Sequence, residues 1–272
     1  MALEQQDLRQ MLETAIVAAR HGGQHALEEI NYVKVYKKNE DELVTNSDKR
    51  CQKIIIDLIR QSYPDHGIIA EESESGNIFK QPPRSDEDIW WTIDPIDGTN
   101  NYAHGILMFT VSIAVICEGE PVVGVIFDPA TESMFTAVKG DEAQLNNRRI
   151  SVGDEELSSV GCVGLSGTYK DGVPKWASEI MQKTKFRNLG TIALQLAYVA
   201  RGGLIGTIAE YVKLWDIAAG VLICESAGAK VTNWQGNSIF PIDMQGYKAE
   251  KMPILAANEK SHAKLLETLK KE

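Results

Sequence analysis

Apolar residues recur with the period of an α-helix near the beginning of the chain. They lie three or four positions apart, at Leu8, Met11, Leu12, Ala15, Ile16 and Ala19. Such spacing places apolar side chains on one face of a helix and leaves polar side chains on the other. The pattern predicts an amphipathic helix over about residues 5–29 with one buried face.

The same helical period returns in a second segment, at Cys51, Ile54, Ile55, Leu58 and Ile59. Serine is a favoured N-cap residue, so we expect this second helix to begin near Ser47. Asp48 then lies in its first turn, where a negative charge interacts favourably with the helix dipole.

Strand patterns dominate the following part of the chain. Apolar and β-branched runs predict strands at residues 66–70, 89–93, 109–117, 122–127 and 133–138. The turn formers at residues 118–121 join two of these strands in a hairpin. Because consecutive strands are joined by short turns, we expect an antiparallel sheet.

The pattern changes again near residue 155, where strands begin to alternate with helices. A strand is predicted at residues 160–164, and helices at 176–183 and 191–201. We therefore expect two lobes, residues 1–153 and residues 154–272, with a boundary between 150 and 157. The first lobe combines the helix pair with the antiparallel sheet, and the second is an α/β lobe.

Composition narrows the classes of function. The 272 residues carry a formal net charge of -10, so the surface lacks the positive field that attracts nucleic acids or acidic membranes. No apolar run approaches the roughly 20 residues of a membrane span, and the beginning of the chain lacks the pattern of a signal peptide. Four dispersed cysteines form no C-x-x-C pair, as expected for buried thiols in a reducing compartment. We expect a cytoplasmic protein with no nucleic-acid or membrane partner.

The segment from Asp94 to Thr99 carries the most informative chemistry. Asp94 and Asp97 are hard oxygen ligands of the type that Mg²⁺ prefers, and Gly98 lets the backbone approach an anion. An EF-hand calcium loop is excluded, because Ile96 stands where that loop requires an oxygen ligand. Read alone, the segment is equally compatible with a plain turn and with a metal-phosphate site.

Further acidic residues are needed to complete a metal site. Glu71 and Glu72 lie in a turn upstream, and Asp216 precedes the apolar run 217–223. Each also has a structural interpretation: Asp216 as a helix cap, and the glutamates as solvated loop charges. Together with Asp94 and Asp97, these residues could hold two cations.

Five motifs in order along the chain resemble the inositol monophosphatase family of Mg²⁺-dependent, lithium-sensitive phosphatases. They are residues 43–48 (LVTNSD), 70–73 (AEES), 94–102 (DPIDGTNNY), 190–191 (GT) and 215–220 (WDIAAG). The resemblance covers about residues 10–260. It implies an α+β fold, the layered αβαβα sandwich of the inositol monophosphatase and fructose-1,6-bisphosphatase type.

The resemblance also implies which residues bind metal. Glu71, Asp94 and the backbone carbonyl of Ile96 would bind a first Mg²⁺. Asp94 would bridge to a second Mg²⁺, which Asp97 and Asp216 also bind. A third, weaker cation near Glu71 is seen in the family, so two or three ions are expected per site. Most ligands then come from the first lobe, and the second lobe contributes Asp216 and substrate contacts.

Catalytic roles follow from the same resemblance. Gly98 and Thr99 would offer backbone N–H groups to the phosphate, and metal-activated water would attack the phosphorus. Thr99 would orient that water and Asp48 would orient Thr99, which makes Thr99, Asp48 and Glu71 the expected catalytic residues. The expected substrate contacts are Asp97, Gly98, Thr99, Gly190, Thr191, Ile192, Glu210 and Asp216.

The substrate is less well defined than the chemistry. Inositol monophosphate is the first candidate substrate, and fructose 1,6-bisphosphate is the main alternative. 3′-Phosphoadenosine 5′-phosphate and histidinol phosphate are less favoured candidates. Glu210 is one residue out of register with the glutamate that inositol-specific members use, so it is equally a substrate contact or a solvated charge. Lys213 could bind an additional phosphate group of the substrate. A non-enzymatic alternative is an interaction protein that keeps the fold. By the resemblance we also expect lithium inhibition and a homodimer.

Overall fold

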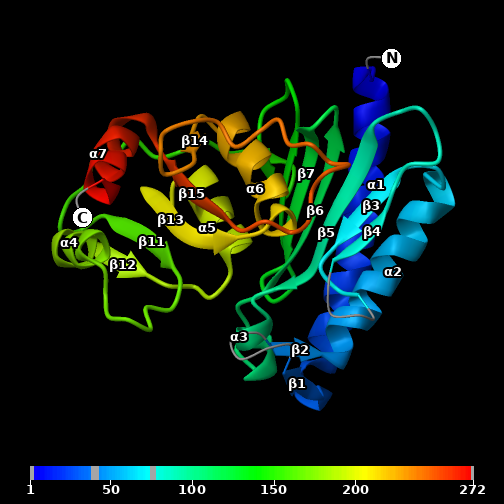
Figure 1. Cartoon of the computed structure of the whole chain (residues 1–272), viewed down its shortest axis with the longest axis horizontal. Helices are drawn as coiled ribbons and strands as arrows, with labels where there is room; N and C mark the ends of the chain where they lie inside the picture. The colour runs from blue at the N-terminus through cyan, green and yellow to red at the C-terminus, as the bar shows by residue number, and fades with distance from the viewer. Residues whose placement is uncertain (1–2, 38–42, 74–77, 271–272) are drawn as a thin grey trace.

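The computed structural model describes residues 3–37, 43–73 and 78–270. Its helices and sheets form five layers, seen edge-on in Figure 1: a helix pair, a large sheet, a second helix pair, a smaller sheet and an outer helix pair. None of the helices in these residues is both long and apolar enough to cross a membrane. The layered α+β fold expected from the sequence is confirmed.

The first layer contains the two predicted amphipathic helices. They are α1 (Gln5–Glu29) and α2 (Asn46–Ser62), separated by the 3-10 helix η1 (Ile30–Tyr32) and the antiparallel ribbon of β1 (Val35–Lys37) and β2 (Leu43–Thr45). The expected N-cap at Ser47 is wrong. Thr45 caps α2 instead, because its side chain accepts from the N–H groups of Ser47 and Asp48 while Asp48 accepts from the N–H of Thr45.

The second layer is an eight-stranded sheet. In spatial order its strands are β10 (Arg148–Arg149), β9 (Gln144–Leu145), β8 (Ser133–Val138), β7 (Glu120–Asp128), β6 (Thr110–Cys117), β5 (Ile89–Asp97), β3 (Gly67–Ala70) and β4 (Phe79–Gln81). The predicted antiparallel hairpins join β6, β7 and β8, and β5 is also antiparallel to β6. The sheet is nevertheless mixed, because β3 and β5 are parallel.

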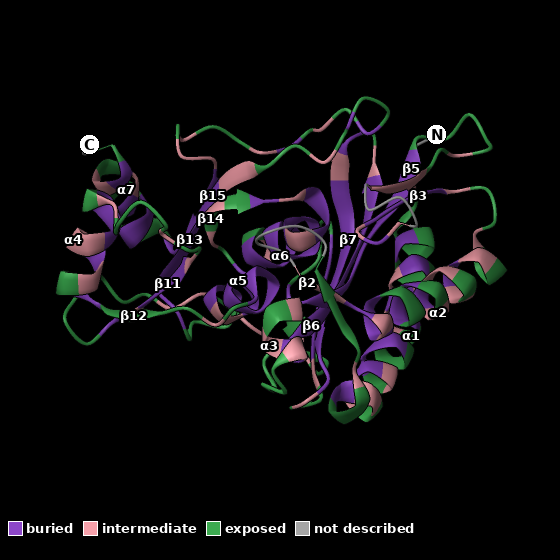
Figure 2. Cartoon of the chain, turned by 60° about the horizontal axis from the view of Figure 1, so that its bottom comes forward, coloured by how far each residue is buried: buried purple, intermediate pink, exposed green. Residues whose placement is uncertain are grey.

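The helix pair packs closely against this sheet. Figure 2 shows the strands of the sheet mostly buried, while α1 and α2 alternate between buried and exposed residues. Two glycines of α1 permit the approach: a Cβ atom on Gly23 would lie 2.7 Å from the ring of Phe127, and one on Gly22 would lie 2.8 Å from Ile55. Any side chain at these positions would push the helix away from its neighbours.

The fourth and fifth layers contain the second sheet and its outer helices. The sheet runs β12 (Lys185–Arg187), β11 (Cys162–Ser166), β13 (Gly206–Val212), β15 (Met252–Ala257) and β14 (Lys230–Thr232). Strands β12, β11 and β13 are parallel, and β15 is antiparallel to both of its neighbours. Helices α4 (Lys175–Lys183) and α7 (Glu259–Leu269) cover its outer face.

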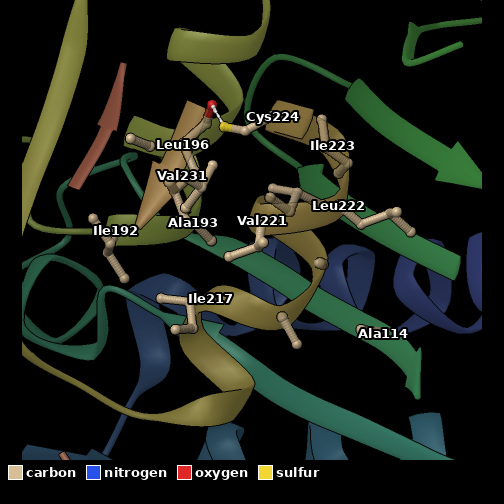
Figure 3. Close-up of a cluster of buried hydrophobic side chains, with 14 of the residues drawn as sticks. Ala114, Ile192, Ala193, Leu196, Ile217, Val221, Leu222, Ile223, Cys224 and Val231 are labelled. Atoms are coloured by element: carbon tan, nitrogen blue, oxygen red, sulfur yellow. Dashed lines mark hydrogen bonds between the residues drawn. The ribbon is translucent and has the colours of Figure 1, made fainter. Parts of the chain in front are cut away.

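The middle layer consists of α5 (Ile192–Ala200) and α6 (Leu214–Ser226). Their buried side chains join residues of both sheets in one hydrophobic cluster, part of which is drawn in Figure 3. Helix α6 lies so close to β7 that a Cβ atom on Gly124 would be 2.8 Å from the carbonyl oxygen of Ala219. Because the cluster is continuous, the two lobes expected on either side of residue 153 share a core, and their boundary stays a prediction.

Candidate functional site

A cavity of about 210 Å³ opens where β5 ends and where α3 (Thr99–Ala103) and α6 begin. Its lining residues are Leu43, Glu71, Asp94, Ile96, Asp97, Gly98, Thr99, Asn100, Tyr211, Lys213, Trp215, Asp216 and Lys251. The fold thus brings all five expected metal-binding residues to one cavity, although they come from three separate parts of the sequence. We call it the acidic cavity.

The end of β5 positions two of the carboxylates. The pairing of β5 with β6 is regular up to Asp94 and then shifts register before Asp97. Pro95, between them, has no N–H to donate to a ladder. The freed backbone turns tightly enough for the Asp94 carboxylate to accept from the N–H of Ile96 at 3.0 Å. The local irregularity therefore directs both Asp94 and Asp97 into the cavity.

Gly98 and Thr99 form the start of the short helix α3. Gly98 has a left-handed backbone with a φ angle of 100°, which favours glycine, and a Cβ atom there would lie 3.0 Å from the carbonyl oxygen of Met108. The hydroxyl of Thr99 donates toward the Asp48 carboxylate at 3.2 Å and the Ile96 carbonyl at 3.0 Å. The predicted contact between Thr99 and Asp48 is thus present in the structure.

Asp48 is fixed by the cap of helix α2. Its second carboxylate oxygen accepts from the N–H of Thr45 at 2.8 Å and from the Thr45 hydroxyl at 2.5 Å. The pKa of Asp48 is raised to about 7, chiefly by burial and also by the charges of Glu71 and Glu72, while the hydrogen bonds from Thr45 oppose the shift. The capping interaction therefore holds a carboxylate rigidly behind Thr99.

Asp97 is held by the beginning of helix α5. One carboxylate oxygen accepts from the hydroxyl of Thr191 and from the N–H of Ala193 at 2.7 Å. Burial raises the pKa of Asp97 to about 7, although both hydrogen bonds lower it. Gly190, Thr191 and Ile192 do not line the acidic cavity. The Ile192 side chain lies in the hydrophobic core (Figure 3). Only its backbone atoms could therefore contact a substrate, and this contact stays a prediction.

Asp216 lies in the first turn of α6, as its position before an apolar run predicts. Its carboxylate accepts from the N–H of Lys213 at 2.7 Å, which makes it a helix-capping residue as well as a cavity residue. Burial raises its pKa well above the usual range, and the charges of Asp97 and Glu71 add to this, while the bond and charge of Lys213 oppose it. The structural and functional interpretations of Asp216 are therefore compatible.

The electrostatics of the cavity favour a bound cation. Burial raises the pKa of Asp94 well above its usual range, and the charges of Glu71, Asp97, Asp216 and Asp48 raise it further. Buried carboxylates that repel one another need a compensating positive charge. The donors are all oxygens, including the Ile96 carbonyl, and hard oxygen donors suit Mg²⁺. The residues present therefore fit the metal that the sequence predicts.

The carboxylates of the acidic cavity are not gathered into a complete metal site. Within residues 3–37, 43–73 and 78–270, no group of three or more His, Cys, Asp or Glu side chains is placed so that it could hold a metal ion. Mg²⁺ usually keeps several waters and binds through a few carboxylates and substrate phosphate oxygens, so waters and phosphate would supply its other ligands.

Several residues outside the expected set also line the acidic cavity. Lys213 was considered for a substrate phosphate, whereas Tyr211, Trp215 and Lys251 had no predicted role as cavity residues. Trp215 belongs to a recognised motif and could have been suspected, but Lys251 has no local signal in the sequence. Glu210 lines a neighbouring cavity instead of this one. Glu72 is buried, and its backbone exchanges hydrogen bonds with the side chain of Gln52.

Known proteins of similar sequence include bacterial relatives of two kinds. The chain is 38% identical over 242 residues to a Pasteurella multocida protein named Nus factor SuhB, covering 83% of this chain and 86% of the relative. It is 38% identical over 196 residues to a Thermotoga maritima fructose-1,6-bisphosphatase/inositol-1-monophosphatase, covering 72% and 73%.

Solved structures and a family model agree with these relatives. The crystal structure of extragenic suppressor protein SuhB from Bartonella henselae superposes with a TM-score of 0.85 at 29% identity, over 96% of this chain and 99% of that one. A Thermotoga maritima IMPase gives a TM-score of 0.82 at 31% identity, over 96% of both chains. The model of the inositol monophosphatase family matches residues 7–272. The chain belongs to the inositol monophosphatase family.

Proposed function

We propose that the protein is a Mg²⁺-dependent phosphomonoesterase that hydrolyses a small polyol or sugar phosphate. The observation that carries this proposal is the convergence of Glu71, Asp94, Asp97 and Asp216 on one cavity beside the pair of Thr99 and Asp48. Membership of a phosphatase family supports the same reaction. The four carboxylates and the Ile96 carbonyl would hold two or three Mg²⁺ ions. When bound, Mg²⁺ supplies positive charge to the phosphate oxygens and lowers the pKa of water.

The chain's own residues would orient the reactants. Thr99 donates its hydroxyl proton toward Asp48 or the Ile96 carbonyl, so its oxygen is free to accept a hydrogen bond from an attacking water and orient it. Asp48 is itself anchored by Thr45, which limits the movement of Thr99. The backbone N–H groups at Gly98 and Thr99 would bind the phosphate. Such positioning lowers the entropic cost of reaching an in-line geometry.

The substrate would be identified by a panel of phosphate esters. Inositol monophosphate is the first candidate. Fructose 1,6-bisphosphate is the second, supported by the name of the Thermotoga maritima relative. Histidinol phosphate and 3′-phosphoadenosine 5′-phosphate follow. Phosphate release should require Mg²⁺ and fall by at least about 100-fold in Asp94→Asn, since the variant loses one of the carboxylate charges that would hold Mg²⁺. The ratio kcat/KM ranks the substrates, because it measures discrimination between transition states.

Lithium provides an independent check on the metal-dependent site. We propose that Li⁺ inhibits phosphate release by replacing one of the more weakly bound cations. Inhibition in the millimolar range that depends on the Mg²⁺ concentration would support the proposal. Equal rates with and without Li⁺ at every Mg²⁺ concentration would refute it.

A second candidate function is that of an interaction protein. Relatives from Pasteurella multocida and Escherichia coli, both 38% identical, carry the name Nus factor SuhB. A stoichiometric partner that binds Asp94→Asn as well as the unchanged protein, combined with no turnover on the panel, would favour this role over catalysis. Turnover together with such a partner would indicate both roles.

We also propose that the protein is a homodimer in the cytoplasm, as family resemblance implies. A mass from light scattering tests the assembly, with a value near twice the 30.0 kDa of the chain expected. A mass near 30.0 kDa at all concentrations would refute the dimer.

A further inference from the structure

A second cavity, of about 580 Å³, adjoins the acidic cavity. Tyr211 and Lys251 line both cavities and therefore stand at their junction. Tyr169, Lys170 and Glu210 contribute to the second cavity alone. We call it the distal cavity.

The sizes of the two cavities suggest that a substrate occupies both. Sites for small organic ligands usually measure roughly 300–1,000 Å³. The acidic cavity, at about 210 Å³, is smaller than this range and must also hold Mg²⁺ ions. The distal cavity is well within the range. A phosphate bound over the acidic residues would therefore extend its alcohol past Tyr211 and Lys251.

The distal cavity offers donors that suit an anion. Lys170 and Lys251 bring two ammonium groups to its wall, and Asp171 and Glu210 bring two carboxylates. The Tyr169 hydroxyl is buried and, among the described residues, no hydrogen-bond partner contacts it. Hydroxyl groups of a polyol can be bound by the carboxylate of Glu210. Ammonium groups form their strongest hydrogen bonds with charged acceptors such as phosphate.

Lys251 is the residue best placed to act on both parts of a substrate. It is exposed, and its ammonium nitrogen lies 5.8 Å from the centre of the Tyr211 ring, a distance typical of a cation–π contact. This contact holds the charge at the junction without requiring burial. A second anionic group that leaves the acidic cavity would pass directly beside it.

We propose that the distal cavity binds a second anionic group on the alcohol part of the substrate, a proposal that rests on the proposed phosphatase function. Lys251 is the specificity-determining residue, and Lys170 and the Tyr169 hydroxyl assist it. The preferred substrates are then phosphorylated polyols or sugars with another phosphate or carboxylate remote from the reacting ester, which moves fructose 1,6-bisphosphate ahead of inositol monophosphate among the candidates.

The test compares two substrates that differ only in the distal group: fructose 1,6-bisphosphate and fructose 1-phosphate. The unchanged protein should have a kcat/KM about 10–100-fold higher for the bisphosphate, the range that one hydrogen bond to a charged group provides. Lys251→Gln should remove most of that preference while changing kcat/KM for fructose 1-phosphate less than about 3-fold. Lys251→Arg should retain it, because arginine keeps the charge.

Lys248→Gln is the matched control, since Lys248 is exposed on the same loop and lines neither cavity. It should leave the preference unchanged. Equal kcat/KM values for the two substrates in the unchanged protein would overturn the proposal. So would a Lys251→Gln variant that loses the same factor on both.

A binding measurement separates this proposal from the proposed reaction. In isothermal titration with Mg²⁺ on a Thr99→Ala background, which slows turnover, the bisphosphate should bind about 10–100-fold more tightly than fructose 1-phosphate, and adding Lys251→Gln should abolish the difference. If neither sugar is hydrolysed but this difference in binding is found, the reaction is wrong and the distal anion site stands. If both are hydrolysed and bind equally, the distal site is wrong and the reaction stands.

Discussion

Replacing Asp97 by asparagine should stabilise the metal-free protein, although Asp97 is a proposed catalytic-site residue. The oxygen that accepts from Thr191 and Ala193 can be replaced by the amide oxygen of asparagine, so both hydrogen bonds can be kept while the buried charge is lost. The pKa of Asp97 rises from 3.8 to about 7 on folding, chiefly through burial. Between these values the folded state binds more protons than the unfolded state, so this group destabilises the fold progressively as pH rises.

The size of the effect follows from the same shift. At 1.36 kcal/mol per pKa unit, ionised Asp97 costs the metal-free fold about 4 kcal/mol at pH 8 and about 2 kcal/mol at pH 5. Asp97→Asn in EDTA should thus gain more stability at pH 8 than at pH 5, and about 8 °C in Tm at pH 8.

Urea denaturation with and without Mg²⁺ at both pH values measures this directly. Mg²⁺ at 100 times its Kd should stabilise the unchanged protein by about 2.7 kcal/mol and the variant by much less. Asp128→Asn is a suitable control: Asp128 is also buried and hydrogen-bonded, but it lies outside the acidic cavity, and its loss should destabilise at both pH values. A destabilised Asp97→Asn at pH 8 in EDTA would refute the reasoning.

Three further predictions concern the fold and the site. Gly124→Ala should cost about 1–3 kcal/mol of unfolding free energy, because its Cβ atom would contact the Ala219 carbonyl oxygen. Gly153→Ala is the control: its Cβ atom would have no contact under 3.5 Å, and it should cost under about 1 kcal/mol. Burial lowers the pKa of His262 from 6.5 to about 4. Between these pH values the unfolded state binds more protons than the folded state, so the free energy of unfolding falls as pH drops. Between pH 7.5 and 5, His262→Gln should therefore lose about 2 kcal/mol less unfolding free energy than the unchanged protein does. Thr99→Ala should lower kcat about 100-fold with a smaller change in KM, and Thr99→Ser should restore most of it; equal losses in both variants would contradict an orienting hydroxyl.

Local patterns in the sequence predicted the elements well where one face is buried. The helix at Gln5–Glu29 has the predicted bounds, because burial of a single face produces a clear period. The strand at Ser133–Val138 also has the predicted bounds, but it is buried on both faces from Met134 onward, and its apolar run rather than an alternation marks it. The cap of α2 was misplaced since Ser47 and Thr45 are both good capping residues, and the choice depends on where Asp48 folds back. The parallel pairing of β3 with β5 is non-local, so neither strand's own pattern reveals it.

The candidate site was predictable to different degrees. Asp94 and Asp97 carry a compact motif, and Asp216 precedes an apolar helix, so their positions could be found before the fold was known. The partnership of Asp97 with the start of α5 could not, because it joins residues 96 positions apart. Lys251 reaches the cavity only through the packing of the loop before β15, which no sequence period records.

Phosphate release with and without Mg²⁺ tests the central claim most directly. The unchanged protein should release phosphate from at least one polyol or sugar phosphate when Mg²⁺ is present, and EDTA should abolish that release. Asp94→Asn should lose at least about 100-fold in kcat/KM, and urea denaturation in EDTA should show that the variant is folded. Turnover that is indifferent to Mg²⁺, or an Asp94→Asn variant as active as the unchanged protein, would contradict the account.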